Sequence, residues 1–90
     1  MDAQMPNSMT NSERYLTDRI VVSRDVSHGK PRIAGTRIMV HLILDLLAAG
    51  KSIEEIIGED YYPDITREDV LACIDYASRV VQNVEFVPLE

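Results

Sequence analysis

The sequence predicts one mainly α domain, a trihelical helix-turn-helix unit preceded by a short pair of β-strands. Two observations predict it. Apolar residues recur at helical spacing in three segments after Val40, and β-branched runs and a glycine-rich loop come before them. The chain has 90 residues, 46% of them apolar, so it has room for a single domain with a small core. A plain helical bundle would show the same pattern, so the pattern alone leaves function open.

The segment before the helices is expected to contain a tail, two strands and a loop. Residues 1–14 are predicted to be a disordered tail, because they are polar and lack a hydrophobic period. The folded domain is then expected over residues 15–81. Ile20-Val21-Val22 predicts one strand, and Ile38-Met39-Val40 predicts a second that pairs with it or with another chain. Glycine and proline predict a structured loop between the two strands.

The first helix is expected to start at Val40 and to end at Gly50. It has two apolar rows and only a thin polar stripe; the rows are formed by Val40, Ile43, Leu44 and Leu47 and by Leu42, Leu46 and Ala49. A helix that is apolar nearly all round needs cover on most sides. Because a 90-residue monomer can hardly supply that cover, we expect a subunit interface and hence a homodimer.

Two capping boxes predict where the other helices begin. Ser52 with Glu55, and Thr66 with Asp69, have the spacing in which side chains and backbone amides satisfy each other. The third helix is expected to run to about Val81. Its predicted inward stripe consists of Val70, Cys73, Ile74, Ala77 and Val81.

Charge is unevenly distributed along the chain. The formal net charge is −6, which argues against a general nucleic-acid binder. Residues 1–45 nevertheless hold six basic and five acidic groups, whereas residues 46–90 hold three and ten. This predicts a small basic surface on an acidic body. The sequence also lacks an apolar run long enough for a membrane span and a secretory pattern over its first 14 residues, so we expect a cytoplasmic protein without a membrane partner.

The string Gly29-Lys30-Pro31-Arg32-Ile33-Ala34-Gly35-Thr36-Arg37-Ile38-Met39-Val40 resembles the G-K-P-x-I-x-G-T-R-I-x-V signature of the domain of unknown function 433 family. Segments over roughly residues 20–77 agree in order, ending at Asp75-Tyr76-Ala77. Tyr61 and the acidic pair Glu59-Asp60 depart from the family pattern outside this motif. The resemblance implies a homeodomain-like helix-turn-helix fold and a small prokaryotic protein. It also implies a VapB-type antitoxin that masks a PIN-like nuclease toxin and, as a dimer, binds its own operator.

Basic and hydroxyl side chains on the motif loop are the candidate nucleic-acid contacts. Lys30, Arg32 and Arg37 lie within eight residues, and Thr36 adds a hydroxyl donor for phosphate oxygens. Each also has a structural alternative, in which Arg37 pairs with Asp25 or Asp45 and Thr36 caps a turn. Arg67 at the third helix is a further candidate, although its acidic neighbours Glu68 and Asp69 make this a poor recognition helix.

Residues 82–90 are expected to form an extended tail outside the trihelical unit. Its apolar residues Phe86, Val87 and Leu89 are flanked by glutamates, which is typical of a segment that binds a groove or a sheet edge on a partner. The alternative is that the tail folds onto its own domain.

Other chemistry finds little support in the sequence. His28 and His41 lack a third metal ligand at helical spacing, Cys73 lies on an apolar stripe, and no acid–base pair stands out. We therefore expect no metal, no cofactor and no enzymatic activity. The expected function is that of an antitoxin-like DNA-binding protein that neutralises a PIN-like toxin and autoregulates its operon. The alternative is a stand-alone transcription regulator or a protein-interaction module.

Overall fold

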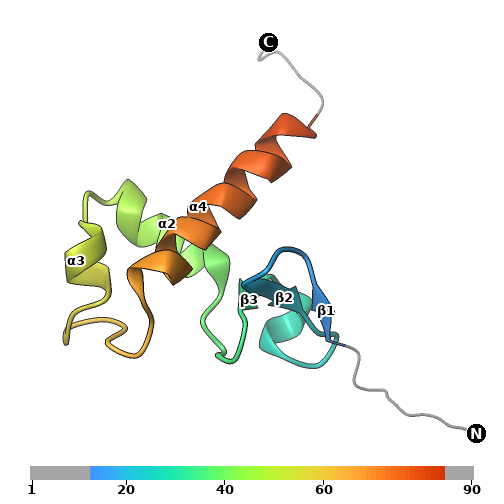
Figure 1. The fold of residues 1–90 in the computed structure, drawn as a ribbon, viewed down its shortest axis with the longest axis horizontal. Coiled ribbons are helices and arrows are strands. Elements are labelled where there is room, and N and C mark those ends of the chain that lie inside the picture. Colours follow the sequence, from blue (N-terminus) through green and yellow to red (C-terminus); the bar gives the residue numbers. More distant parts are fainter. Residues whose placement is uncertain (1–12, 85–90) are drawn as a thin grey trace, which may run out of the picture.

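The structure, a computed structural model, describes residues 13–84. Within them, three short strands precede three helices. The elements in chain order are β1 (Arg14–Tyr15), β2 (Ile20–Val22), the 3-10 turn η1 (Ser27–Gly29), β3 (Arg32–Ile33), α2 (Val40–Ala48), α3 (Ile53–Ile56) and α4 (Arg67–Gln82). In Figure 1 the sheet lies at one end of the molecule and α3 at the other, with α2 and α4 crossing between them. The chain is thus a mixed α/β unit with a mainly helical body.

The strands form one antiparallel sheet in the order β1-β2-β3. Its central strand carries two fully covered side chains, Ile20 and Val21. The register pairs Tyr15 with Val21 on one side and Ile20 with Ile33 on the other. The expected strand at Ile20–Val22 is therefore confirmed, but it has two partners instead of one.

The second predicted strand is wrong. Val40 begins α2, and Met39 forms only an isolated bridge with Arg32. The true partner strand lies inside the predicted loop, where Ile33 is 2% exposed and packs in the core. Gly35, at φ +79°, lets the chain reverse so that the Ile33 amide can donate to the Ile38 carbonyl at 2.9 Å.

The strand β1 extends the folded unit toward the N-terminus. It begins at Arg14, within the segment predicted to be a tail. The short hairpin is closed by the Leu16 amide, which donates to the Ile20 carbonyl at 2.7 Å. Periodicity could not reveal a strand of two residues whose side chains are both exposed.

The helices begin where the sequence predicts. Both capping boxes are present, since Ser52 accepts from the Glu55 amide and Thr66 accepts from the Asp69 amide, with each carboxylate bonded back to the cap residue. The helix α2 ends at Ala48, and Gly50 follows at φ +93°. A four-residue turn, 49–52, joins α2 to α3, and residues 57–66 join α3 to α4.

The core lies where α2 and α4 cross beside the sheet. Its buried residues are Ile20, Ile33, Val40, Ile43, Ile56, Ile65, Val70 and Cys73. The predicted inward stripe of α4 is correct for Val70 and Cys73 but wrong for Ile74 and Val81, which are 40% and 70% exposed. The C-terminal half of α4, which includes Val81, extends beyond the body of the chain (Figure 1). None of the helices within residues 13–84 is long and apolar enough to cross a membrane.

Candidate functional site

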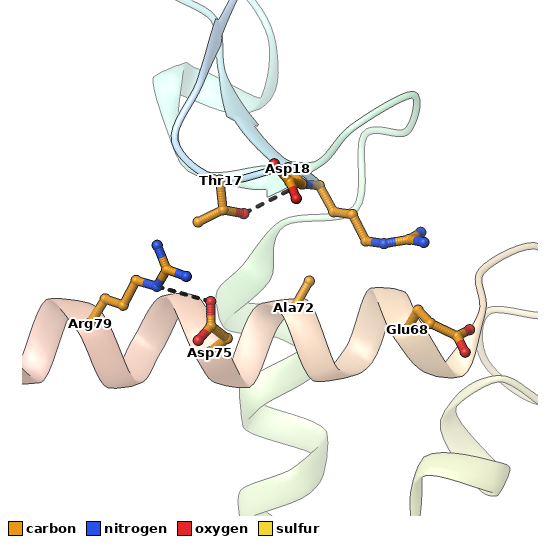
Figure 2. Close-up of a pocket in the computed structure, with 7 residues that line it drawn as sticks. Thr17, Asp18, Glu68, Ala72, Asp75 and Arg79 are labelled. Atoms are coloured by element: carbon orange, nitrogen blue, oxygen red, sulfur yellow. Dashed lines mark hydrogen bonds and ion pairs between the residues drawn. The ribbon is translucent and has the colours of Figure 1, made fainter.

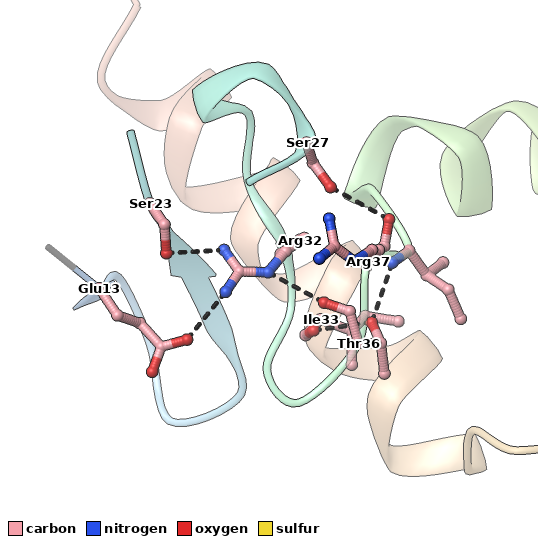
Figure 3. A network of polar contacts seen from close by, with 8 residues as sticks. Glu13, Ser23, Ser27, Arg32, Ile33, Thr36 and Arg37 are labelled. Carbon is pink, nitrogen blue, oxygen red and sulfur yellow. Dashed lines mark hydrogen bonds and ion pairs between the residues drawn. The ribbon is translucent and has the colours of Figure 1, made fainter. Parts of the chain in front are cut away.

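The loop that carries the glycine-rich motif is organised around the side chain of Arg32. This guanidinium is almost completely buried, at 5% exposure for the residue. Its Nε donates to the Thr36 carbonyl at 2.9 Å, Nη1 to the Ser23 hydroxyl at 3.1 Å and Nη2 to a Glu13 carboxylate oxygen at 2.8 Å. Figure 3 shows these three partners arranged around one planar group. Arginine can bond in several directions within its plane, and here it does.

Two of these partners immediately precede exposed arginines. Ser23 precedes Arg24, and Thr36 precedes Arg37. Further hydrogen bonds hold the backbone at Thr36, next to Arg37. The Thr36 hydroxyl donates to the Ile33 carbonyl at 2.8 Å and accepts from the Ile38 amide at 3.0 Å. The Ser27 hydroxyl also donates to the Arg37 carbonyl at 3.2 Å. The buried Arg32 thus fixes the backbone from which two exposed cations project.

The turn η1 has a left-handed backbone. Ser27, His28 and Gly29 have φ values of 51°, 58° and 75° in succession. Glycine tolerates this region, whereas a residue with a Cβ is held there at a cost of about 1 kcal/mol or more. The turn is closed by two backbone bonds of 3.0 Å, from the Gly29 amide to Val26 and from the Lys30 amide to Ser27.

A hollow of about 570 Å³ lies beside this turn. It is lined by Arg24, Asp25, Ser27, His28, Arg37 and Met39. Arg24 and Arg37 are exposed, and neither forms an ion pair with another residue between 13 and 84. Lys30, also exposed, follows the same turn. We call the three cations Arg24, Lys30 and Arg37, together with the neighbouring His28 side chain, the cationic loop surface. Exposed guanidinium and ammonium groups with backbone held in place are suited to contact phosphate oxygens.

The predicted nucleic-acid residues divide into two groups. Lys30 and Arg37 belong to the cationic loop surface, and Arg37 makes no ion pair with Asp25 or Asp45 in the part of the chain described. Arg32 and Thr36 instead take the structural alternative, because their side-chain polar atoms are bonded to other residues of the domain. The Arg32 guanidinium is thus occupied by internal partners, and its direct contact with phosphate stays a prediction.

The remaining predicted residues lie elsewhere. Arg67, the first residue of α4, forms an exposed ion pair with Glu54 at 3.0 Å, far along the chain from the loop. Phe86, Val87 and Leu89 lie outside the described residues. Two members of the surface, Arg24 and His28, were not predicted from the sequence. No motif or spacing in the sequence marks either residue, and the fold brings both of them to the hollow beside the left-handed turn.

A second hollow, between the β1–β2 turn and α4, carries balanced charge. Figure 2 shows Thr17 and Asp18 facing Glu68, Ala72, Asp75 and Arg79 across it. Arg79 pairs with Asp75 at 3.0 Å, and the nearby Arg19 pairs with Asp69 at 3.0 Å. Because its cations are already paired, this hollow offers less to an anion than the cationic loop surface.

The third hollow is an apolar groove of about 330 Å³, which we call the α2–α4 groove. It is lined by Lys30, Pro31, Val40, His41, Leu44, Tyr76, Ala77, Val80 and Val81. Its floor is apolar, and its ionisable lining residues besides Tyr76 are Lys30 and His41. Such a surface suits an apolar segment of a protein.

The thiol of Cys73 takes no part in these surfaces. It is fully covered by the core, and burial together with the nearby Asp69 carboxylate raises its pKa to about 12. A thiol with so high a pKa is protonated, and hence a poor nucleophile, at neutral pH. Across residues 13–84, no group of three or more His, Cys, Asp and Glu side chains is placed to hold a metal ion.

Comparison with known proteins gives one match. The family model described as a protein of unknown function (DUF433) matches residues 20–77, which is more than half of the chain and contains the whole glycine-rich motif. Neither the curated proteins nor the solved structures include a match to this sequence.

Proposed function

Because the chain belongs to the domain of unknown function 433 family and carries the cationic loop surface, we propose that it is an antitoxin-like DNA-binding protein. In this role it neutralises a PIN-like nuclease toxin, binds its own operator and acts in the cytoplasm. The observation that carries the DNA-binding part is the set of exposed cations without ion-pair partners among residues 13–84, on a chain whose net charge is −6. A local basic surface acts within a Debye length of about 8 Å despite that net charge.

The loop, and not the third helix, is the proposed DNA contact. The first turn of α4 contains Glu68 and Asp69, and its one cation, Arg67, is paired with Glu54. Carboxylates at that position repel phosphate. The four-residue turn between α2 and α3 supports a homeodomain-like helix-turn-helix arrangement, which in this chain serves to hold the loop instead of reading the major groove through α4.

The toxin partner is proposed on two grounds. Family resemblance supplies the class of partner, a VapB-type antitoxin being paired with a PIN-like nuclease. The charge of residues 46–90, which hold three basic and ten acidic groups, supplies a physical reason. Carboxylates on the helical body can occupy the basic cleft with which a nuclease holds its nucleic-acid substrate.

The DNA-binding part is tested with two matched double variants. Arg24→Ala with Arg37→Ala removes two cations from the cationic loop surface. Arg67→Ala with Arg79→Ala removes two cations that are paired on exposed helix surface, so the net charge changes equally. We expect fluorescence anisotropy with DNA from upstream of the gene to show at least roughly tenfold weaker binding for the loop variant only. The slope of the logarithm of its DNA affinity against the logarithm of salt concentration should fall by an amount that corresponds to about two released counterions.

Three results would count against DNA binding through the loop. These are wild-type protein that does not bind the DNA, equal losses in both double variants, and an unchanged affinity in the loop variant. Circular dichroism checks that both variants remain folded, which we expect because all four side chains are exposed.

The toxin part is tested by co-expression with the product of the adjacent gene. The expected result is a complex that co-purifies and in which the nuclease is inactive. If no such complex forms, the alternative of a stand-alone transcription regulator or interaction module is favoured. The DNA experiment then decides between those two, since only the regulator binds DNA.

A further inference from the structure

We propose that the α2–α4 groove is the interface with a second copy of this chain, in which the C-terminal half of each α4 lies in the groove of its partner. The relevant apolar positions are Val70, Cys73, Ala77 and Val80 on α4 and Val84 just beyond its C-terminal end. They alternate at steps of three and four residues, as in the a and d positions of a coiled coil.

This stripe changes from buried to exposed along the helix. Val70 and Cys73 are fully covered by the chain's own core. Val80, one heptad after Cys73, is 41% exposed, and Val84, two heptads after Val70, is 64% exposed. The neighbouring Val81 is 70% exposed. Figure 1 shows why, since this half of α4 extends past the body of the molecule. The second half of the stripe therefore forms an apolar ridge for which the described chain provides no cover.

The groove shares Val80 and Val81 with this ridge, so the ridge forms one wall of the groove on the same face. Its walls are Val40 and Leu44 of α2 and Ala77 of α4, and the small Ala77 side chain leaves room for a neighbour to approach closely. A surface with a ridge and a groove side by side is self-complementary under a two-fold axis, because each copy supplies the part that the other lacks. A two-fold contact also closes after two copies.

Charge favours a second copy over a basic protein as the occupant. The lining of the groove contains no carboxylate, whereas Asp75 and its partner Arg79 line the hollow on another face of α4. Two copies of a chain with a net charge of −6 repel least where neither presents carboxylates. A basic partner would gain nothing from such a face.

The helix ends add a specific attraction. In a two-fold pair with antiparallel α4 helices, the C-terminal end of the partner's α4 points toward the body of the chain, where Lys30 lines the groove. The last carbonyl groups of a helix carry partial negative charge, so they attract this ammonium group. Lys30 also belongs to the cationic loop surface. The dimer therefore places the cationic loop surfaces of both copies beside one interface. The use of these two surfaces in DNA binding rests on the proposed function, whereas the interface itself does not.

The oligomeric state of the full chain tests the interface. We expect light scattering after size exclusion to give about twice the 10.2 kDa mass of one chain. Val81→Asp, at a 70% exposed position in the groove, should give a folded monomer because it buries a charge only in the pair. Leu71→Asp is the matched control, since Leu71 is also exposed on α4, at 45%, but does not line the groove. It should leave the mass unchanged.

A covalent trap gives an independent measurement. In Val81→Cys protein the only other thiol is the buried Cys73, so oxidation is expected to join two copies through position 81. A wild-type monomer, an undiminished dimer in Val81→Asp, or equal disruption by Leu71→Asp would each overturn the proposal. A dimer that does not bind DNA would instead contradict the proposed function without contradicting this interface.

Discussion

The Arg32 guanidinium lies 2.8 Å from the Glu13 carboxylate, and this ion pair ties the residue before β1 to the centre of the motif loop. The arginine side chain is 6% exposed and the glutamate side chain 43%. The charged group of Arg32 is thus removed from water, but it donates hydrogen bonds to a carboxylate, a hydroxyl and a carbonyl. A group of this kind both stabilises the loop and makes its shape unique.

Replacement of Arg32 is expected to destabilise the whole domain. Arg32→Ala removes three hydrogen bonds and leaves the Ser23 hydroxyl and the Thr36 carbonyl without their partner. We expect the free energy of unfolding to fall by about 2–3 kcal/mol, as measured by urea denaturation. Arg32→Lys should recover only part of this loss, because an ammonium group cannot reproduce the planar set of donors.

The control for this prediction is Arg67→Ala. Its ion pair with Glu54 is exposed on both sides, at 54% and 75%, so a change within about 0.5 kcal/mol is expected. Equal stabilities of Arg32→Ala and Arg67→Ala would contradict the central role of the buried guanidinium.

The start of α4 depends on the hydroxyl of Thr66. Its oxygen accepts from the Asp69 amide at 3.2 Å, and the Thr66 amide donates to the Asp69 carboxylate at 3.0 Å. Thr66→Ala removes the first of these bonds and is expected to lower the free energy of unfolding by about 1 kcal/mol. Thr66→Ser keeps the hydroxyl and should restore most of the loss. If the thermal unfolding midpoint of Thr66→Ser equals that of Thr66→Ala instead of that of the wild type, the hydroxyl does not cap the helix.

The capping box of α3 predicts a specific response to acid. The Ser52 amide donates to the Glu55 carboxylate at 2.8 Å, and this bond is the main cause that lowers the Glu55 pKa below its ordinary value of 4.5. A lowered pKa stabilises the folded state above the unfolded pKa, and this contribution disappears as the pH falls through the folded value.

Carbon-detected NMR titration of the Glu55 side chain measures this effect. The expected midpoint lies below the ordinary glutamate value of 4.5. In Glu55→Gln the pH dependence contributed by this side chain should vanish, while the bond from the Ser52 amide remains possible. A Glu55 midpoint equal to that of an exposed glutamate would show that the box is open in solution.

The buried thiol predicts protection from alkylation. Because its pKa is raised to about 12, Cys73 should be almost entirely protonated at pH 8, and its sulfur is covered by the core. Native protein should therefore react with iodoacetamide far more slowly than protein in urea. Rapid modification of the native chain would mean that the core opens often at the crossing of α2 and α4.

The helices were largely predictable from the sequence, because their signals are local. The two capping boxes and the position of Gly50 fix the ends of α2, α3 and α4 to within about a residue or two. The exposed half of α4 could not be predicted. Val70 and Val81 lie on the same helical face, and only the extent of the surrounding core decides which of them is buried.

The sheet and the candidate site were harder to predict, because they depend on distant contacts. The β-branched run after Gly35 looked like a strand, yet the shorter β3 pairs with β2 because Ile33 fills the core. The motif marks the loop that carries the proposed DNA contacts. Which cations of the motif face solvent depends on two residues outside it. Glu13, just before β1, and Ser23, just after β2, bind the Arg32 side chain and keep it buried.

The left-handed turn at Ser27–Gly29 implies a trade-off between folding and surface chemistry. Glycine would adopt these backbone angles with less strain than Ser27 or His28 does. Ser27 has a structural reason to be there, its bond to the Arg37 carbonyl, whereas His28 is exposed and lines only the hollow. In urea denaturation, His28→Gly should therefore make the domain more stable, while the loop surface loses the contact area of the imidazole. At this position a side chain with a Cβ lowers the stability of the fold. This is expected of a residue whose function is to contact another molecule.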